Sequence, residues 1–199
     1  MGCFIESQRF PVDVVNIASS VEKKGGGRPD FWEMVFWWTR KPLASSRAVL
    51  LGAILPFDYP SDRFTRIVYP SYTGRRDKPF SKTPHALNPR LELLDKTVLE
   101  RVKNARILDP FAGFGSIPLE AIRLGFGEVV AVELLPTAVV FLKAILEYPV
   151  KYGSKLVKDV ERMGRYIVEK LREDPDVKTL YDEDIAVYIG SWMVKCPYC

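Results

Sequence analysis

The fold is decided by one Gly-rich stretch, Asp109-Pro110-Phe111-Ala112-Gly113-Phe114-Gly115-Ser116. A short apolar run at 105–108 precedes it, and an apolar segment with helical periodicity, 117–124, follows it. The order of strand, Gly-rich turn and helix is typical of a nucleotide-type ligand site at the carboxyl end of a parallel strand. Gly113 and Gly115 allow the backbone to approach a ligand closely, and a helix N-terminus directs free N–H groups towards an anionic group.

A second strand with an acidic end supports this interpretation. Residues 128–132 are mostly apolar and predict the strand, which Glu133 ends. A carboxylate at this point can accept hydrogen bonds from both hydroxyls of a ribose. The stretch departs from the dinucleotide fingerprint G-x-G-x-x-G, because Pro118 stands at the third glycine position, so a dehydrogenase is the weaker interpretation. An ordinary strand-to-helix turn in an unrelated α/β protein remains the alternative.

Composition sets broad limits on the class of protein. The chain has 199 residues, of which 47% are hydrophobic and 27% charged, values typical of a globular protein. A formal net charge of +4 permits a nucleic-acid partner without requiring one. No apolar run reaches the roughly 18 residues of a membrane span, and the N-terminus lacks a signal-peptide pattern. Three cysteines do not form a disulfide framework, so we expect a cytoplasmic protein with no membrane partner.

The sequence predicts three segments: a helical and irregular segment at 1–90, a ligand-binding core at 91–150 and a helical insert at 151–199. Within the first, the glycines at 25–27 predict a flexible loop, Asp30 an N-cap, 31–38 an aromatic helix and 44–55 a second helix. The aromatic helix is expected to face the core, with base stacking or cofactor covering by one tryptophan as the alternative. Residues 56–90 predict a long irregular connection.

The second half of the chain predicts further helices and a cysteine pair. A helix is expected from 91 to about 102, another from Pro136 to about 147, and a charged amphipathic helix at 155–171. Short strands are expected at 185–189 and 192–194. Cys196 and Cys199 form a Cys-x-x-Cys pattern, which is half of a tetrahedral zinc site, and two surface thiols without metal are the alternative. His85, the only histidine, is expected to be a surface or capping residue.

Four regions together carry a family resemblance. They are 4–12, the tryptophan-rich element F-W-W-T-R-K-P-L-A-S-S-R-A at 36–48, the two ligand motifs at 109–121 and 133–139, and W-M-V-K-C-P-Y-C at 192–199. Over its whole length the chain resembles a family of adenine-specific DNA methylases that contain a zinc ribbon. The Gly-rich stretch is similar to the version used by methyltransferases that act on exocyclic amino groups of bases.

The resemblance implies an α/β fold and a cofactor. The fold would be a partial Rossmann-like class I methyltransferase fold, with an N-terminal helical segment and a helical insert leading to a truncated zinc ribbon. S-adenosylmethionine (SAM) would be bound by Asp109, Pro110, Phe111, Ala112, Gly113, Gly115, Ser116, Glu133 and Leu134. In that arrangement the backbone of 112–115 holds the amino-acid end, Glu133 binds the ribose, and Phe111 and Leu134 flank the apolar faces. Zinc would be bound by Cys196 and Cys199 as a half site.

One motif of this class of enzymes is missing. The target amino group is held there by a D/N/S-P-P-Y/F/W loop, which in the family lies downstream of the zinc ribbon, and no Pro-Pro pair occurs in the 199 residues. We therefore expect the SAM-binding part of a DNA amino-methyltransferase, inactive by itself, whose partners are DNA and either a downstream catalytic polypeptide or a second copy. An RNA amino-methyltransferase and a non-catalytic subunit that binds SAM or a partner chain are the alternatives. The tryptophan element and the cysteine pair favour DNA over RNA. The segment 84–91 also resembles the element that lies beside the methionine end of the cofactor.

Overall fold

The chain forms two compact units, Met1–Lys151 and Tyr152–Cys199. The computed structural model describes residues 2–35, 37, 39–181, 190 and 192–197. The first unit is a mixed α/β structure, and the second contains the helices α8 (Ser154–Glu173) and α9 (Pro175–Leu180). The two units are described separately.

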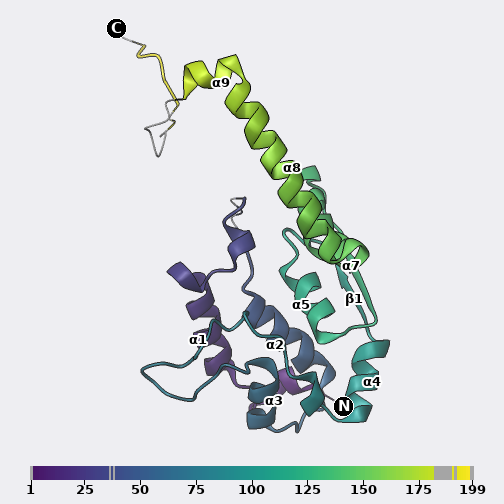
Figure 1. The fold of residues 1–199 in the computed structure, drawn as a ribbon. Coiled ribbons are helices and arrows are strands. Elements are labelled where there is room, and N and C mark those ends of the chain that lie inside the picture. The colour runs from purple at the N-terminus through teal and green to yellow at the C-terminus, as the bar shows by residue number, and fades with distance from the viewer. Residues whose placement is uncertain (1, 36, 38, 182–189, 191, 198–199) are drawn as a thin grey trace. The chain divides into compact units, whose positions relative to one another are not determined.

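The first unit contains a strand–helix–strand unit (Figure 1). The strands β1 (Arg106–Asp109) and β2 (Glu128–Ala131) are parallel, with Asp109 opposite Ala131. The helix α5 (Ser116–Leu124) connects them, as parallel pairing requires a crossover. Both expected strands and the expected helix are confirmed, and β1 extends to include Asp109. Within the described ranges the sheet has only these two strands.

Glycines determine both ends of α5. Gly115 and Gly125 have φ of +76° and +80°, the left-handed region in which a side chain is unfavourable. The Gly125 N–H donates to the carbonyls of Ala121 and Ile122 and so satisfies the last turn of the helix. Pro118 lies in the first turn, where no helical hydrogen bond needs its missing N–H. The sequence therefore specifies where this helix begins and ends.

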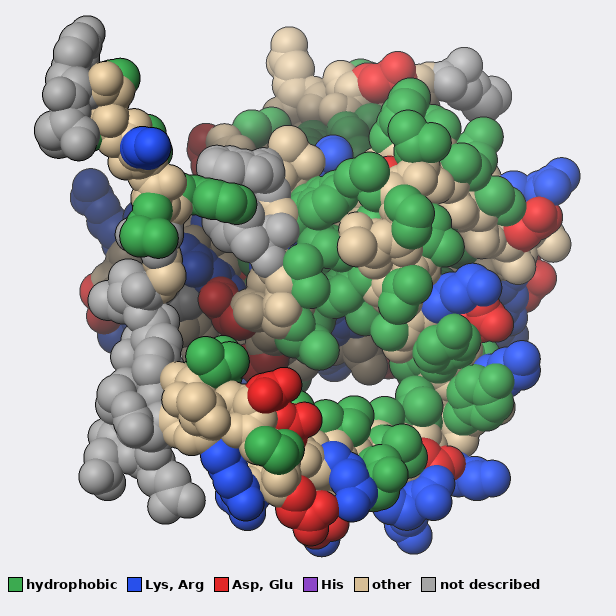
Figure 2. Space-filling model, turned by 90° about the horizontal axis from the view of Figure 1, so that it is seen from above, with side chains coloured by type: hydrophobic (Ala, Val, Ile, Leu, Met, Phe, Trp, Pro, Cys, Tyr) green, Lys and Arg blue, Asp and Glu red, His purple; other side chains and the backbone are tan. Residues whose placement is uncertain are grey.

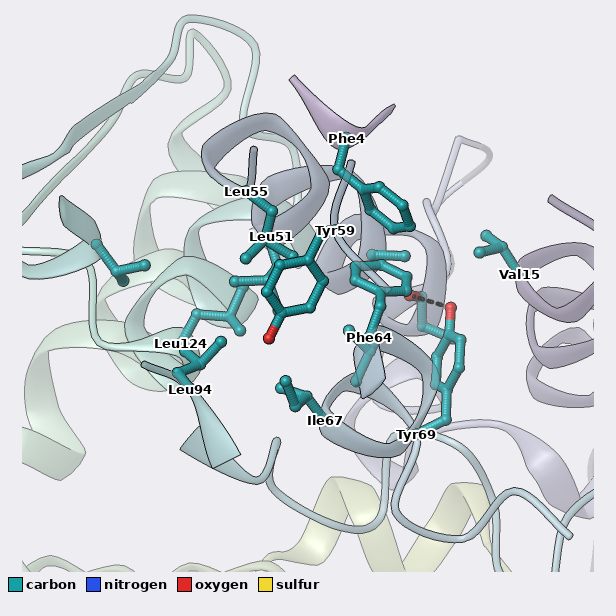
Figure 3. Close-up of a cluster of buried hydrophobic side chains, with 14 of the residues drawn as sticks. Phe4, Val15, Leu51, Leu55, Tyr59, Phe64, Ile67, Tyr69, Leu94 and Leu124 are labelled. Carbon is teal, nitrogen blue, oxygen red and sulfur yellow. Dashed lines mark hydrogen bonds between the residues drawn. The ribbon is translucent and has the colours of Figure 1, made fainter. Parts of the chain in front are cut away.

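The remaining helices of the first unit surround a hydrophobic core (Figure 3). They are α1 (Val12–Lys23), α2 (Leu43–Ile54), α3 (Ser61–Val68) and α4 (Lys96–Asn104), with 3-10 turns at Phe4–Glu6, Gly25–Gly27, Asp30–Trp32 and Leu91–Leu93. The helix α2 packs against α1 on one side and α5 on the other (Figure 1). The core contains Phe4, Leu51, Leu55, Phe64, Ile67, Val102 and Leu124. Burial of such side chains is the main favourable term in folding.

The structure differs from the expected helices in several places. The described part of 31–38 forms only the 3-10 turn Asp30–Trp32 followed by bends, so the aromatic helix predicted there is wrong. The connection at 56–90 contains the amphipathic helix α3, which the sequence analysis missed. The glycine run forms a 3-10 turn, and a side chain would not fit at Gly27, where a Cβ would lie 2.1 Å from the Val21 carbonyl oxygen. No strand forms at 192–194, and 185–189 lie outside the described residues.

The helix that follows β2 contains a wide turn. It begins as α6 (Pro136–Leu142), continues as the π-helical segment Lys143–Glu147, and ends as α7 (Tyr148–Tyr152). Pro136 occupies its first turn, as expected. The side chains of Leu142 and Ile145 face Gly115: a Cβ on that glycine would lie 2.7 Å and 3.3 Å from their terminal carbons. The π turn therefore packs against the beginning of α5.

Many large hydrophobic side chains are also exposed. Figure 2 shows them in green on one face of the molecule, interspersed with basic and acidic side chains. In the first unit the most exposed include Met34, Phe111, Leu134 and Val150. Two of these, Phe111 and Leu134, belong to the predicted ligand site. Among the helices in the described ranges, none combines the length and the hydrophobicity that a bilayer crossing requires.

A buried carboxylate caps α2 from another helix. The residue before α2 is Pro42, which has no side-chain donor or acceptor. Glu22, fully buried in α1, instead accepts hydrogen bonds from the backbone N–H groups of Leu43 at 2.6 Å and Ala44 at 2.8 Å. These N–H groups have no partner within the helix, so Glu22 satisfies them and fixes α1 against α2.

A buried ion pair joins α2 to α5. Arg47 and Glu120 are both fully buried, and Arg47 donates through Nε at 2.5 Å and Nη2 at 3.2 Å to the two carboxylate oxygens. Arg123 donates to the same carboxylate at 2.6 Å. The remaining N–H groups of Arg47 donate to the carbonyls of Val68 and Leu87, each at 3.0 Å. The two arginines therefore hold the irregular segment before α4 against both helices.

We expect the loss of either partner of this ion pair to destabilise the first unit strongly. Arg47→Met or Glu120→Gln should each lower the free energy of unfolding by about 3–5 kcal/mol, because each leaves a buried polar or charged group without its partner. The double variant Arg47→Met/Glu120→Met should lose less than the sum. Urea denaturation measures all three, and Arg75→Met, which removes an exposed pair with Asp77, is the control that should change nothing. Additive losses in the double variant would contradict the coupling.

A second prediction concerns pH. Burial raises the pKa of Glu22 from 4.5 to about 7, against the opposing effect of its two amide hydrogen bonds. The folded state therefore binds a proton that the unfolded state releases, so Glu22 should make stability fall as pH rises from about 4.5 to about 7. The slope should not exceed about 1.4 kcal/mol per pH unit. Denaturation of the wild type and Glu22→Gln across this range isolates the effect, since His85, whose pKa is lowered by burial, contributes equally to both. Parallel stability curves would refute it.

Candidate functional site

The Gly-rich stretch is held in place by backbone hydrogen bonds to the residue after β2. The Ala112 N–H donates to the Val132 carbonyl at 3.0 Å, and the Val132 N–H donates to the Asp109 carbonyl at 2.9 Å. The Gly115 N–H donates to the Ala112 carbonyl at 2.8 Å, which closes the turn before α5. Gly113 makes this turn possible with a φ of +53°. The loop therefore has a defined shape without a ligand.

Glu133 joins this loop to the turn that follows β2. Its Oε2 accepts a hydrogen bond from the Gly113 N–H at 2.7 Å, and its Oε1 accepts from the N–H groups of Leu134 at 2.8 Å and Leu135 at 3.2 Å. The amides of Leu135, Leu134 and Gly113 lower the pKa of Glu133, so the carboxylate is charged at neutral pH. A carboxylate has about four acceptor positions, and the fourth, on Oε2, remains for a ligand hydroxyl.

A pocket of about 230 Å³ lies over the loop and is called the loop pocket below. One wall is formed by the loop, the start of α5 and Glu133, and the other by residues from the N-terminal segment. Its lining residues are Trp37, Thr39, Arg40, Lys41, Asp109, Phe111, Ala112, Gly113, Phe114, Ser116, Ile117 and Glu133. The loop pocket therefore combines backbone N–H groups, two acids and two cations around a small enclosed space.

The structure brings most of the predicted site residues to the loop pocket. Those that line it are Asp109, Phe111, Ala112, Gly113, Ser116 and Glu133. Pro110, Gly115 and Leu134 do not line it. Gly115 instead faces the π turn after α6, and Leu134 is 90% exposed beside Glu133. Phe111 is 83% exposed. The large apolar side chains of Phe111 and Leu134 are therefore both exposed to solvent.

The sequence analysis missed one wall of the loop pocket. Thr39, Arg40 and Lys41 lie between the helices expected at 31–38 and 44–55, and no sequence pattern places them at a site some seventy positions downstream. The alternative that one tryptophan covers a cofactor concerns the same part of the chain. Trp37 lines the loop pocket, and its ring centroid lies 4.5 Å from that of Phe114. The only local indication was the run of two cations directly after a cluster of aromatic residues.

The segment 84–91 has a structural part in this arrangement. The carbonyls of His85 and Leu87 accept hydrogen bonds from Arg123 at 2.8 Å and 2.9 Å. His85 is partly buried, and its Nδ1 has no hydrogen-bond partner among the described residues. None of the residues 84–91 lines the loop pocket. Instead, the carbonyls of this segment accept hydrogen bonds from Arg47 and Arg123 of the buried ion-pair network.

A second cavity lies beside the outer edge of β1. It has a volume of about 620 Å³ and is lined mainly by α2 and β1, with Val49, Leu50 and Leu108 among its apolar residues. Lys41 and Ile117 line both this cavity and the loop pocket. The second cavity has few polar groups that could orient a ligand, so the loop pocket is the better candidate site.

The cysteine pair gives no metal site within the described residues. Cys196 is exposed, and Cys199 lies outside the described ranges. In the part of the chain that the structure describes, no three His, Cys, Asp or Glu side chains gather as metal ligands. Zinc binding by Cys196 and Cys199 stays a prediction from the sequence, and no step of the proposed function depends on it.

We expect Gly115 to be intolerant of any side chain. Gly115→Ala should lower the free energy of unfolding by more than the roughly 1–2 kcal/mol that a left-handed residue costs, because the new Cβ would also lie 2.7 Å from Leu142. Gly74→Ala is the matched control: it has a φ of +71° with nothing within 4 Å of the added carbon. Thermal and urea denaturation compare the two, and equal losses would show that the contact with the π turn is unimportant.

Comparison with models of protein families gives a match to the N-terminal part of the chain. Residues 9–67 match a family described as "Protein of unknown function (DUF1156)". This stretch covers α1, α2 and most of α3, together with the Thr39–Lys41 wall of the loop pocket. No curated protein matches the chain, and no solved structure does.

Proposed function

We propose that the chain binds SAM in the loop pocket, as the methyl donor for an exocyclic amino group of a DNA base. The observation that supports this most is the contact between Glu133 and the Gly113 N–H. It brings the acidic residue after the second strand and the Gly-rich loop after the first strand into one wall of one pocket. A ribose-binding acid and a backbone cradle are needed side by side to bind the nucleoside and amino-acid parts of a single ligand.

The residues of the loop pocket fit the parts of such a ligand. The backbone of 112–115 would bind the amino-acid end, and the remaining Oε2 acceptor position of Glu133 would bind a ribose hydroxyl. At about 230 Å³ the loop pocket is smaller than the roughly 300–1,000 Å³ of typical ligand pockets. Part of the ligand would therefore lie outside it, and the exposed side chains of Phe111 and Leu134 offer apolar surface for the adenine ring.

The chemistry proposed for this ligand requires positioning more than acid–base groups. SAM supplies a sulfonium methyl group that is displaced in line by the acceptor nitrogen. The chain's residues bind and orient the donor, which lowers the entropic part of the barrier. A rigid loop serves this purpose, and the loop here is fixed by the hydrogen bonds of Ala112, Gly113 and Gly115. The choice of DNA as the methyl acceptor is supported by the tryptophan element and by the mildly basic net charge of +4.

Calorimetric titration with SAM tests the proposal. Gly113→Val should abolish binding, because its side chain would extend into the loop pocket from a position that contacts Trp37. Glu133→Ala should weaken binding by about 1–3 kcal/mol, through loss of a hydrogen bond to a charged acceptor and of the loop's anchor. Gly74→Val is the matched control, since Gly74 also has a positive φ but lies away from the loop pocket. It should bind SAM like the wild type.

Melting curves without ligand accompany each titration, so that a loss of binding is separated from a loss of folding. Binding that survives both Gly113→Val and Glu133→Ala would place the ligand elsewhere. A wild-type protein that binds neither SAM nor S-adenosylhomocysteine at millimolar concentration would refute the proposed function.

A further inference from the structure

Arg40 lies in the loop pocket against aromatic rings. Its guanidinium carbon is 5.7 Å from the ring centroid of Phe114 and 5.8 Å from that of Trp32. Both rings are buried. Phe114 belongs to the Gly-rich loop itself, so Arg40 is positioned at the 112–115 end of the loop pocket. The cation–π contacts hold the guanidinium where its other N–H groups can face a ligand.

This cation forms no ion pair with the residues that the structure describes. The Nε of Arg40 is buried and has no hydrogen-bond partner among them. Burial lowers the pKa of Arg40, although a guanidinium remains charged at any physiological pH. A buried donor on a charged group that lacks an acceptor is unfavourable, so an anion at this point would be bound favourably.

The acids of the loop pocket do not supply that anion. Asp109 accepts a hydrogen bond from the Phe111 N–H at 3.2 Å, and Glu133 accepts from three amides of the loop and of the turn after β2. Lys41, the other cation of the loop pocket, is exposed to solvent and does not have the planar fork of a guanidinium. Arg40 is therefore the residue best placed to bind an anionic group of a ligand, and a carboxylate is the group whose two oxygens match its geometry.

We propose that Arg40 binds the carboxylate of the ligand's amino-acid moiety, an inference that rests on the proposed function. The carboxylate would be the counter-ion that the guanidinium lacks among the described residues, and the contact with Phe114 places it at the 112–115 end of the loop pocket. Arg40 then has a specificity role. It selects adenosine compounds that carry an amino-acid carboxylate over those that do not.

The test is a cycle that removes the cation from the protein and the anion from the ligand. Calorimetry measures the binding of S-adenosylhomocysteine and of its decarboxylated analogue, which keeps the amine, to the wild type and to Arg40→Met. Methionine keeps an unbranched, apolar side chain but removes the guanidinium and its contacts with Trp32 and Phe114. We expect the wild type to bind S-adenosylhomocysteine about 10- to 100-fold more tightly than the analogue, the range for a hydrogen-bonded charge pair. In Arg40→Met this preference should fall to about twofold or less.

Two further variants sharpen the result. Arg40→Lys keeps the charge but not the fork, so its preference should lie between those of the other two proteins. Arg75→Met removes an exposed cation that does not line the loop pocket and should retain the wild-type preference. The wild-type comparison of the two ligands needs no variant, so the carboxylate contribution is measured even where Arg40→Met fails to fold.

Each contrary outcome has a distinct meaning. Equal weakening of both ligands by Arg40→Met would show a structural role and overturn the inference, and so would a wild type that does not distinguish the ligands. If Arg40→Met leaves both affinities unchanged but weakens binding of a DNA duplex in a fluorescence anisotropy assay, the anion is a backbone phosphate and the inference is wrong. A wild type that binds neither adenosine ligand would refute the proposed function, and the inference with it.

Discussion

The buried ion pair between Arg47 and Glu120 is the constraint on which the first unit depends. Each partner lies in a different helix, and neither can be buried without the other at acceptable cost. The pair fixes α2 against α5, and α5 begins at the Gly-rich loop. The helices before the loop and the strand–helix–strand unit therefore form one compact body, in which Trp37 and 39–41 lie at the loop. The geometry of the loop pocket therefore depends on the packing of α2 against α5.

Within the loop pocket, one carboxylate has two tasks. Glu133 stabilises the loop through the Gly113 amide, and it is also the group proposed to bind the ribose. Because three of its acceptor positions are already used, a ligand meets an acid that is fixed in position and charged. Such preorganisation lowers the free-energy cost of ordering side chains when a ligand binds. Arg40 differs from Glu133, because its buried Nε has no acceptor among the described residues.

The sequence predicts the parts of the fold that local chemistry controls. Glycines and prolines mark the ends of α5 and the start of α6, and short apolar runs identify β1 and β2. Sequence patterns do not predict contacts between distant residues. Glu22 caps a helix that begins after Pro42, and Arg47 pairs with Glu120, which lies 73 positions later. No periodicity in the sequence indicates such pairs. The approach of Trp37 and 39–41 to the loop was missed for the same reason, because it depends on the packing of α2.

The π-helical segment Lys143–Glu147 has a consequence for how the chain can change. A π turn holds one residue more than an α-helical turn, so its presence sets the rotation of every side chain after it. Here that rotation directs Ile145 to the side of the helix that packs on Gly115. If one residue between 143 and 147 were lost and the turn became a regular α-helical one, the side chains after it would keep their direction, because the regular turn holds one residue fewer. Such a loss would change the turn itself, where Ile145 lies beside Gly115, so the extra residue contributes to the packing against the loop and not to the course of α7.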